Sequence, residues 1–223
     1  IESLNHAGIY NDAKINLDLI DSEKITKENV EEKLGHCDGI VVPGGFGERG
    51  IEGLIDTVEF ARTRDIPFLG ICLGMQLSVI EFARNVLNYK DANSTEFDPN
   101  CSVPIVEQLD GQPPVNEFSG AMRLGAYPCK LASGTISREV YGEDLISERH
   151  RHKYEVNTEY REELEKGGLK IAGTSPDNKL IEAIENPKNK WFVAVQYHPE
   201  FKSRPNRPHP LFKDFVRASV ENK

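Results

Sequence analysis

The sequence is organised around residues 68–76, which read FLGICLGMQ. Residues 66–71 form a short apolar run, a pattern typical of a buried strand. From Leu73 onward apolar residues recur at helical spacing, so we expect a helix that begins just after Cys72. A cysteine on such a turn faces a helix N-terminus, which favours the thiolate, and the free N–H groups there can hold an oxyanion. Cys72 is therefore a candidate nucleophile, and the alternative is a small buried core residue.

The sequence contains two glycine-rich turns, where the lack of side chains lets the backbone come close to a substrate or to a neighbouring segment. Gly70 and Gly74 flank Cys72 and fit a strained turn like the nucleophile elbow of hydrolases. Residues 43–50, PGGFGERG, follow a predicted strand at 39–42. Gly44 and Gly45 form either a tight turn without a ligand or a backbone that donates an N–H to an oxyanion. The spacing matches neither a dinucleotide fingerprint nor a Walker A loop, which excludes nucleotide binding by those routes.

Composition narrows the class of protein. The length of 223 residues fits one large α/β domain, and a net charge of −9 argues against a nucleic-acid-binding surface. No apolar run approaches membrane-spanning length, and we expect no signal peptide and no membrane partner. The four cysteines contain no C-x-x-C pair, which disfavours a metal site and a disulfide framework and favours the cytoplasm. We interpret three of them as structural, namely Cys37, Cys101 and Cys129.

The order of elements predicts the fold class. Predicted strands cover residues 14–20, 39–42, 66–71, 103–109, 122–131, 169–172, 180–185 and 191–197. Predicted helices end at Gly8 or cover 26–34, 51–64, the segment after Cys72, 159–166 and 210–220, with a Gly/Pro-rich connection at 111–114. This order indicates an α/β fold with a doubly wound, mostly parallel central sheet, helices on both faces and an added antiparallel strand region. Because a helix end opens the chain, we expect the first strand of the domain to lie outside this sequence.

Two residues that could act as the base for a thiolate and as the partner of that base follow the last predicted strand. His198 and Glu200 follow the apolar run 191–197, at the carboxyl end of a strand, where open α/β sheets present functional side chains. His198 can exchange a proton with Cys72, and Glu200 can hold the imidazole tautomer. This role requires the strand before Cys72 and the strand before His198 to be neighbours in the sheet. The alternatives are a surface histidine and a solvated carboxylate.

A basic run stands out in this acidic chain. Residues 148–155 read ERHRHKYE. They form either a solvated strand face or a surface that neutralises a carboxylate-bearing substrate, an acidic partner or a phosphate.

Six stretches together resemble the class I (triad) glutamine amidotransferases and, among these, the glutaminase domain of the CTP synthase family. They are residues 42–47 (VPGGFG), 70–76 (GICLGMQ), 93–97 (NSTEF), 122–125 (MRLG), 149–152 (RHRH) and 198–201 (HPEF). The resemblance extends over the whole chain, so it implies one glutaminase domain over residues 1–223 with the fold of that class.

The resemblance implies roles for individual residues. Cys72 would form a γ-glutamyl thioester, His198 and Glu200 would complete the triad, and the N–H groups of Gly45 and Leu73 would form the oxyanion hole. The residues implied to bind L-glutamine are Gly45, Leu73, Gly74, Met75, Gln76, Glu96 and Lys153. The family has an arginine where Lys153 stands, and a lysine keeps the charge but loses the bidentate fork. The positions associated with GTP activation are Arg49, Gly50 and Glu52.

The resemblance also implies a larger enzyme. That enzyme would make CTP from UTP, ATP and glutamine, with magnesium, with GTP as activator, and with an N-terminal synthase (amidoligase) domain that this sequence lacks. This chain would convert glutamine to glutamate and ammonia without a cofactor or metal of its own. The whole enzyme would be a homotetramer, and we expect the chain alone to be a monomer.

Three other interpretations stay open at this point. The first is a glutaminase of another amidotransferase, such as that of GMP or anthranilate synthesis. The second is a non-catalytic regulatory or binding member of the same fold. The third is a γ-glutamyl peptidase.

Overall fold

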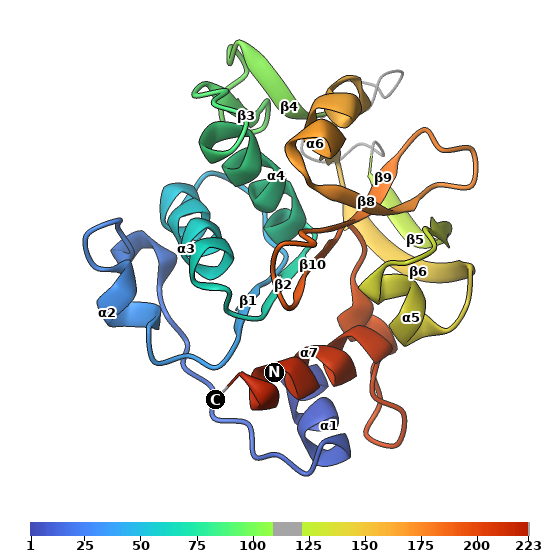
Figure 1. The fold of residues 1–223 in the computed structure, drawn as a ribbon. Coiled ribbons are helices and arrows are strands. Elements are labelled where there is room, and N and C mark those ends of the chain that lie inside the picture. Colours follow the sequence, from blue (N-terminus) through green and yellow to red (C-terminus); the bar gives the residue numbers. More distant parts are fainter. Residues whose placement is uncertain (109–121, 223) are drawn as a thin grey trace.

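The structure, a computed structural model, describes residues 1–108 and 122–222 (Figure 1). A seven-stranded mixed sheet has the strand order β1-β2-β10-β9-β8-β5-β6, and a second sheet has the order β3-β4-β7. The strands of the large sheet are β1 (Ile40–Val42), β2 (Phe68–Ile71), β10 (Phe192–Val195), β9 (Ile181–Glu185), β8 (Lys170–Thr174), β5 (Arg123–Leu131) and β6 (Leu145–His152). The strands of the small sheet are β3 (Ala92–Ser94), β4 (Val103–Gln108) and β7 (Tyr154–Val156).

Helices cover both faces of the large sheet. The α-helices are α1 (Glu2–Tyr10), α2 (Val30–Leu34), α3 (Ile51–Arg64), α4 (Leu73–Asn85), α5 (Ile136–Tyr141), α6 (Arg161–Gly167) and α7 (Pro210–Glu221). Short 3₁₀ helices are η1 (Ser22–Lys24), η2 (Thr158–Tyr160) and η3 (Pro199–Lys202). One core packs α3 and α4 against Phe68 and Phe192, and a second packs α1 and α7 against Leu69 and Val193 (Figure 1). Within residues 1–108 and 122–222, every helix falls short of the length and apolarity needed to cross a membrane.

The α/β fold class is confirmed, with a mixed sheet. β1, β2 and β10 run parallel, and Val195 of β10 lies opposite Ile71 of β2. The other pairs, from β10 to β6, are antiparallel. Antiparallel pairs therefore outnumber the parallel ones, contrary to the prediction of a mostly parallel sheet. The reason is that turns rather than helices connect β8, β9 and β10, and strands joined by short turns pair antiparallel.

Residues 14–20 are not a strand, contrary to the prediction from their alternation. Ile15 packs on the core beside α7 and Ile20 on the core beside α3, so the segment passes around the β1 edge of the sheet. Leu17 and Leu19 are exposed, and in the described chain these residues join neither sheet. Alternation describes side chains, but a strand also needs a neighbour for its backbone groups.

Other boundaries shift, and one helix was not predicted. The helix predicted at 26–34 begins only at Val30, because Asn29 Oδ1 accepts from the Thr26 N–H and closes a turn before it. The first helix continues past Gly8 to Tyr10, and α5 was not predicted. The helix at Ile51–Arg64 is confirmed. The predicted strand end at Leu109 and the predicted connection at 111–114 lie outside the described residues.

Candidate active site

Cys72 occupies a strained turn between β2 and α4. Its φ is 53° and its ψ is −101°, a backbone conformation that non-glycine residues rarely adopt. A Cβ added to Gly74 would lie 2.3 Å from Val42 O, so this turn packs too closely on β1 for any larger residue. The Cys72 N–H donates to Val195 O at 2.7 Å, which ties the turn to β10. The predicted elbow is confirmed.

His198 and Glu200 meet Cys72 across two neighbouring strands. Because β10 pairs with β2 in parallel, the carboxyl ends of both strands lie at one edge of the sheet. His198 Nδ1 lies 2.6 Å from Glu200 Oε1. A Cβ added to Gly44 would lie 2.7 Å from His198 Cε1 and 3.5 Å from Cys72 Cβ, so both side chains converge on the loop after β1. The predicted proximity of these strands is confirmed.

The contacts of His198 favour its charged form. Burial opposes the positive charge, but the contacts with Cys72 and Glu200 outweigh burial and raise the pKa of the imidazole from 6.5 to about 10. Phe201 stacks on the ring, with centroids 5.2 Å apart. At neutral pH His198 is therefore an imidazolium, the state that pairs with a thiolate and can donate a proton to a leaving group.

The residues that carry the two predicted oxyanion donors, Gly45 and Leu73, are neighbours in space. A Cβ added to Gly45 would lie 3.1 Å from Leu73 Cδ2. Leu73 is the first residue of α4, and the N–H of such a residue has no acceptor inside its helix. The loop after β1 therefore lies beside the start of α4, whose first N–H groups have no acceptor inside the helix.

Glu96 and Lys153, two of the predicted glutamine-binding residues, lie near this loop, whereas Met75 is buried in the core. Glu96 Oε1 accepts from the Gly47 N–H at 3.0 Å. Burial raises the pKa of Glu96, while the Gly47 N–H and the charge of Lys153 act in the opposite direction, so Lys153 lies close enough to influence Glu96. Gln76 is buried, and its amide nitrogen already donates to Tyr154 O at 2.8 Å. Gln76 is therefore anchored within the protein.

The residues associated with GTP are paired within the chain. Arg49 Nη2 lies 2.7 Å from Glu23 Oε2, and Glu52 accepts from Arg84 Nη1 at 3.0 Å. Gly50 has a φ of 69°, and a Cβ there would lie 2.1 Å from Ser22 Oγ. Arg49 and Gly50 end the loop beside η1, and Glu52 lies in the first turn of α3, facing Arg84 of α4.

The basic run divides between two faces of β6. His150 and His152 are buried, whereas Arg149 and Arg151 are exposed. The interpretation of the run as a solvated strand face is therefore wrong for the two histidines, because strand alternation turns every second side chain inward. The Arg151 guanidinium lies over the Phe46 ring, 5.1 Å from its centroid.

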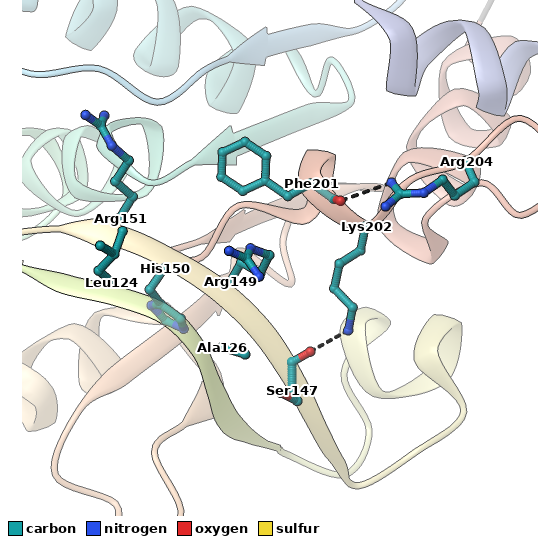
Figure 2. A pocket seen from close by; sticks show the side chains of 9 residues that line it. All are labelled: Leu124, Ala126, Ser147, Arg149, His150, Arg151, Phe201, Lys202 and Arg204. Carbon is teal, nitrogen blue, oxygen red and sulfur yellow. Dashed lines mark hydrogen bonds between the residues drawn. The ribbon is translucent and has the colours of Figure 1, made fainter.

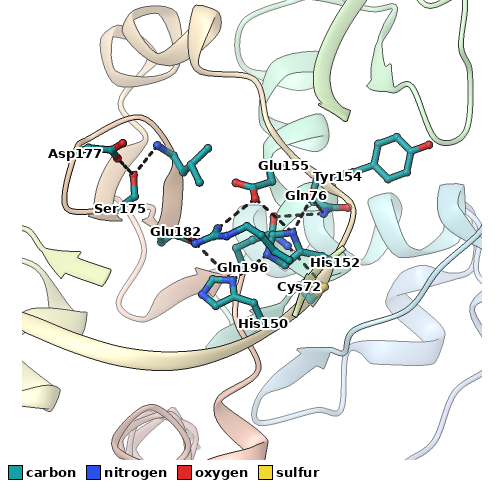
Figure 3. A network of polar contacts seen from close by, with 12 residues as sticks. Cys72, Gln76, His150, His152, Tyr154, Glu155, Ser175, Asp177, Glu182 and Gln196 are labelled. Carbon is teal, nitrogen blue, oxygen red and sulfur yellow. Dashed lines mark hydrogen bonds and ion pairs between the residues drawn. The ribbon is translucent and has the colours of Figure 1, made fainter. Parts of the chain in front are cut away.

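The inward histidines join a buried polar network behind Cys72 (Figure 3). Arg123 donates to Glu155 Oε1 at 3.2 Å and to Glu182 Oε1 at 2.8 Å. Burial and the charge of Arg123 lower the pKa of His150 to about 2 and that of His152 to about 3, so both are neutral. Burial raises the pKa of Glu155 to about 7. Sequence reasoning missed Arg123 and Glu182 as members of this network.

A basic pocket opens beside His198 (Figure 2). Its volume is about 750 Å³, and it is lined by Leu124, Ala126, Ser147, Arg149, His150, Arg151, Phe201, Lys202 and Arg204. Two lining residues contact His198: Phe201 stacks on its ring, and Arg149 O accepts from the His198 backbone N–H at 2.7 Å. Within the described residues, no group of three or more His, Cys, Asp or Glu side chains is arranged to hold a metal ion.

Sequence reasoning also passed over Gln196. This glutamine is fully buried beside Cys72, and its Nε2 lies 3.6 Å from Cys72 Sγ. The signal was available, since a glutamine directly follows the apolar residues 191–195 and precedes His198 by two positions.

Comparisons with known proteins agree with this geometry. A family model for class I glutamine amidotransferases matches residues 1–218. CTP synthases from Clostridium kluyveri and Carboxydothermus hydrogenoformans are 55% and 56% identical over 223 and 220 residues. These matches cover 100% and 99% of this chain but 42% and 41% of the relatives. The chain thus spans about two-fifths of the length of these curated relatives.

Solved structures show the same fold. The glutaminase domain of Trypanosoma brucei CTPS, with bound acivicin, has a TM-score of 0.93 and 37% identity, covering 100% of this chain and 87% of that one. A putative GMP synthase protein from Thermoplasma acidophilum shares the fold, with a TM-score of 0.55 and 17% identity over 97% of this chain and 84% of that one. The chain therefore belongs to the class I glutamine amidotransferase family, and within that family its relatives are CTP synthases.

Proposed function

We propose that this chain hydrolyses L-glutamine to glutamate and ammonia through a Cys72-His198-Glu200 triad. The observation that carries the proposal is the convergence of a strained cysteine, a charged histidine and its carboxylate partner at the carboxyl ends of β2 and β10. In the relatives this domain belongs to CTP synthases, so the ammonia would serve the ATP-dependent amination of UTP to CTP.

The first half-reaction forms a thioester. The Cys72 thiolate attacks the side-chain carbonyl carbon of glutamine, and the carbonyl oxygen becomes an oxyanion held by the Gly45 and Leu73 N–H groups. His198 donates its proton to the amide nitrogen, the C–N bond breaks, and ammonia leaves. The product on the enzyme is a γ-glutamyl thioester on Cys72.

The second half-reaction regenerates the enzyme. His198, now neutral, takes a proton from water, and the hydroxide formed attacks the thioester carbon. The C–S bond breaks, glutamate leaves, and Cys72 becomes a thiolate beside the His198 imidazolium again. Glu200 holds the Nδ1–H of His198 throughout. Neither half-reaction needs a metal or cofactor.

The remaining residues would recognise the substrate. Gly74, Met75 and Gln76 at the start of α4 would shape the pocket. Glu96 would bind the α-amino group of glutamine, and Lys153 would bind its α-carboxylate. The two charges are close enough to interact, as the pKa of Glu96 indicates, and they match the two charges of an amino acid.

The whole protein would carry more functions than this chain. We propose an amidoligase domain that uses ATP, magnesium and UTP, a homotetrameric assembly and a cytoplasmic location. We also propose that Arg49, Gly50 and Glu52 contribute to activation by GTP. Arg49 and Gly50 lie on the loop that carries Gly45, and Glu52 follows it in the first turn of α3. This position supports the proposal, because a ligand there would act on the proposed oxyanion donor.

The test is labelling with acivicin, an electrophilic glutamine analogue. We expect one adduct, on Cys72 by peptide mapping, that excess L-glutamine suppresses and that a Cys72→Ser variant lacks. The other three cysteines serve as internal controls. Labelling spread over Cys37, Cys101 and Cys129, or labelling that glutamine does not suppress, would contradict an assembled glutamine pocket.

A further inference from the structure

A buried thiolate needs hydrogen-bond donors. Cys72 is 2% exposed, so water contributes little to the stability of its charged form. Among the described residues His198 Nε2 has no hydrogen-bond partner, although the ring lies close enough to Cys72 for that contact to raise the pKa of the imidazole. The carbonyl oxygen of Arg151 lies 3.9 Å from Sγ, but a carbonyl can only accept and so cannot donate a hydrogen bond to a thiolate. The side-chain amide of Gln196, 3.6 Å from Sγ, is the group whose orientation matters.

A glutamine amide can present either oxygen or nitrogen to the sulfur, and a chain of contacts decides between them (Figure 3). Tyr154 O is a backbone carbonyl and can only accept, so the Gln76 atom 2.8 Å away from it must be nitrogen. The same Gln76 nitrogen lies 3.3 Å from Gln196, so the Gln196 atom facing it must be oxygen. The other end of the Gln196 amide, its N–H₂ group, therefore faces Cys72 Sγ.

The start of this chain of contacts is itself held in place. His152 Nδ1 lies 3.1 Å from Tyr154 O, and His152 Nε2 lies 2.9 Å from His150 Nδ1. Since both histidines are neutral, each can donate one N–H, from His150 to His152 and from His152 to Tyr154 O. Gln76 and Gln196 are 3% and 0% exposed, so water cannot easily replace any of these contacts.

We propose that Gln196 donates an N–H to the Cys72 thiolate and that Gln76 is the positioning residue that holds Gln196 in the donating orientation. This inference rests on the proposed function, because it requires Cys72 to be the nucleophile. The hydrogen bond stabilises sulfur when it is charged, before attack and again when the thioester breaks. It loses strength when the sulfur is acylated and neutral.

The inference predicts an effect on Cys72 from a residue that does not touch it. In Gln196→Met the donor is lost and the volume is nearly kept. In Gln196→Glu a carboxylate faces the sulfur. In Gln76→Glu the new carboxylate can only accept, so it draws the Gln196 N–H toward itself and turns the Gln196 oxygen to the sulfur.

The experiment measures the rate at which iodoacetamide alkylates Cys72 between pH 5 and pH 10, followed by intact mass and peptide mapping. Iodoacetamide is small and does not need the glutamine pocket, so the midpoint of the profile reports the thiolate. We expect Gln196→Met and Gln76→Glu to raise the midpoint by about one pH unit, a tenfold loss of thiolate at lower pH, and Gln196→Glu to raise it further. The matched control is Asn186→Asp, a buried amide that directly follows β9, donates its N–H to Phe192 O at the start of β10 and accepts from the Lys188 N–H. Its midpoint should equal that of the unmodified chain.

The outcomes separate the two proposals. If the unmodified chain shows no glutamine-protected, reactive Cys72, the proposed function fails and this inference fails with it. If the unmodified chain reacts and folded Gln196→Met keeps the same midpoint, only the donor role of Gln196 is overturned. If Gln196→Met does not fold, as thermal unfolding would show, Gln76→Glu decides by the same criterion.

Discussion

His198 Nδ1 lies 2.6 Å from Glu200 Oε1, although Pro199 between them begins the 3₁₀ helix η3. The proline at the first helical position sets the tight turn that brings the two side chains together. A carboxylate at this distance favours the imidazolium and fixes the tautomer of His198 once the proton is lost. The first prediction concerns this pair.

Replacing Glu200 with glutamine should lower glutaminase turnover by at least about 10²-fold, because an amide neither balances the imidazolium charge nor enforces one tautomer. Loss of the negative partner also lowers the pKa of His198. Turnover of the unmodified chain should fall as the pH rises through about 10, and this alkaline limb should move to lower pH in Glu200→Gln. The measurement is turnover against pH, with the exposed Glu143→Gln as control. An unshifted alkaline limb would argue against the pair.

Gly44→Ala should lower turnover by roughly 10²-fold and lower the free energy of unfolding by about 1 to 3 kcal/mol. The added Cβ would lie 2.7 Å from His198 Cε1, and the ring cannot easily yield while Glu200 holds its Nδ1. Gly44 does not have the positive φ that favours glycine, so alanine adds crowding without that backbone strain. The control is Gly142→Ala, which adds strain at a φ of 73° but meets no atom within 4 Å. Wild-type turnover in Gly44→Ala would contradict the placement of the ring.

Lys153→Arg should lower the KM for glutamine, and Lys153→Met should raise it about tenfold, with smaller effects on kcat. An arginine adds the bidentate fork that suits a carboxylate, whereas methionine removes the charge. Steady-state kinetics check this, with the exposed Lys130→Arg as the matched control. Equal KM values in all four proteins would remove Lys153 from the glutamine site.

Glu155→Gln should change how stability depends on pH. The pKa of Glu155 is raised from 4.5 to about 7 in the folded chain, so the folded state binds this proton more tightly than the unfolded state. The contribution of Glu155 to the free energy of unfolding is full below pH 4.5 and is lost as the pH rises through 7. The unfolding free energy of the unmodified chain, minus that of Glu155→Gln, should therefore fall by up to about 3 kcal/mol over this window.

Urea unfolding at pH 5, 6, 7 and 8 measures this difference. Glu155 faces Arg123, Glu182 and His152, all of which stay in both proteins. Both His150 and His152 have a lowered pKa, so their contributions are lost as the pH falls below 6.5, and they largely cancel in the difference. A difference that does not vary with pH would show that Glu155 stays ionised.

Local patterns predicted the elements in which backbone preference and burial agree. The strand before Cys72, the helix after it and the helix at Ile51–Arg64 all follow from apolar periodicity and glycine position. The proximity of Cys72, His198 and Glu200 was predictable because each residue ends or follows an apolar strand. Residues 14–20 failed because their alternation carries no information about a partner strand.

The buried network could not be predicted from local patterns. In the sequence His150 and His152 are part of one basic run, and only the sheet shows that their face meets Arg123, Glu155 and Glu182. The orientation of Gln196 likewise depends on Tyr154 O, from a segment 42 positions away in the chain (196 − 154). Such contacts arise from packing between distant segments, which periodicity does not describe.

The hydrogen bond from the Cys72 N–H to Val195 O has a consequence for how activity can be controlled. It makes the nucleophile and the strand that leads to His198 parts of one backbone ladder, so the two cannot separate unless the ladder breaks. Gly45 lies outside this ladder, on the loop between β1 and α3. If Gly45 supplies an oxyanion donor as proposed, a rotation of its loop peptide would withdraw that donor and leave the hydrogen bond between Cys72 and Val195 intact.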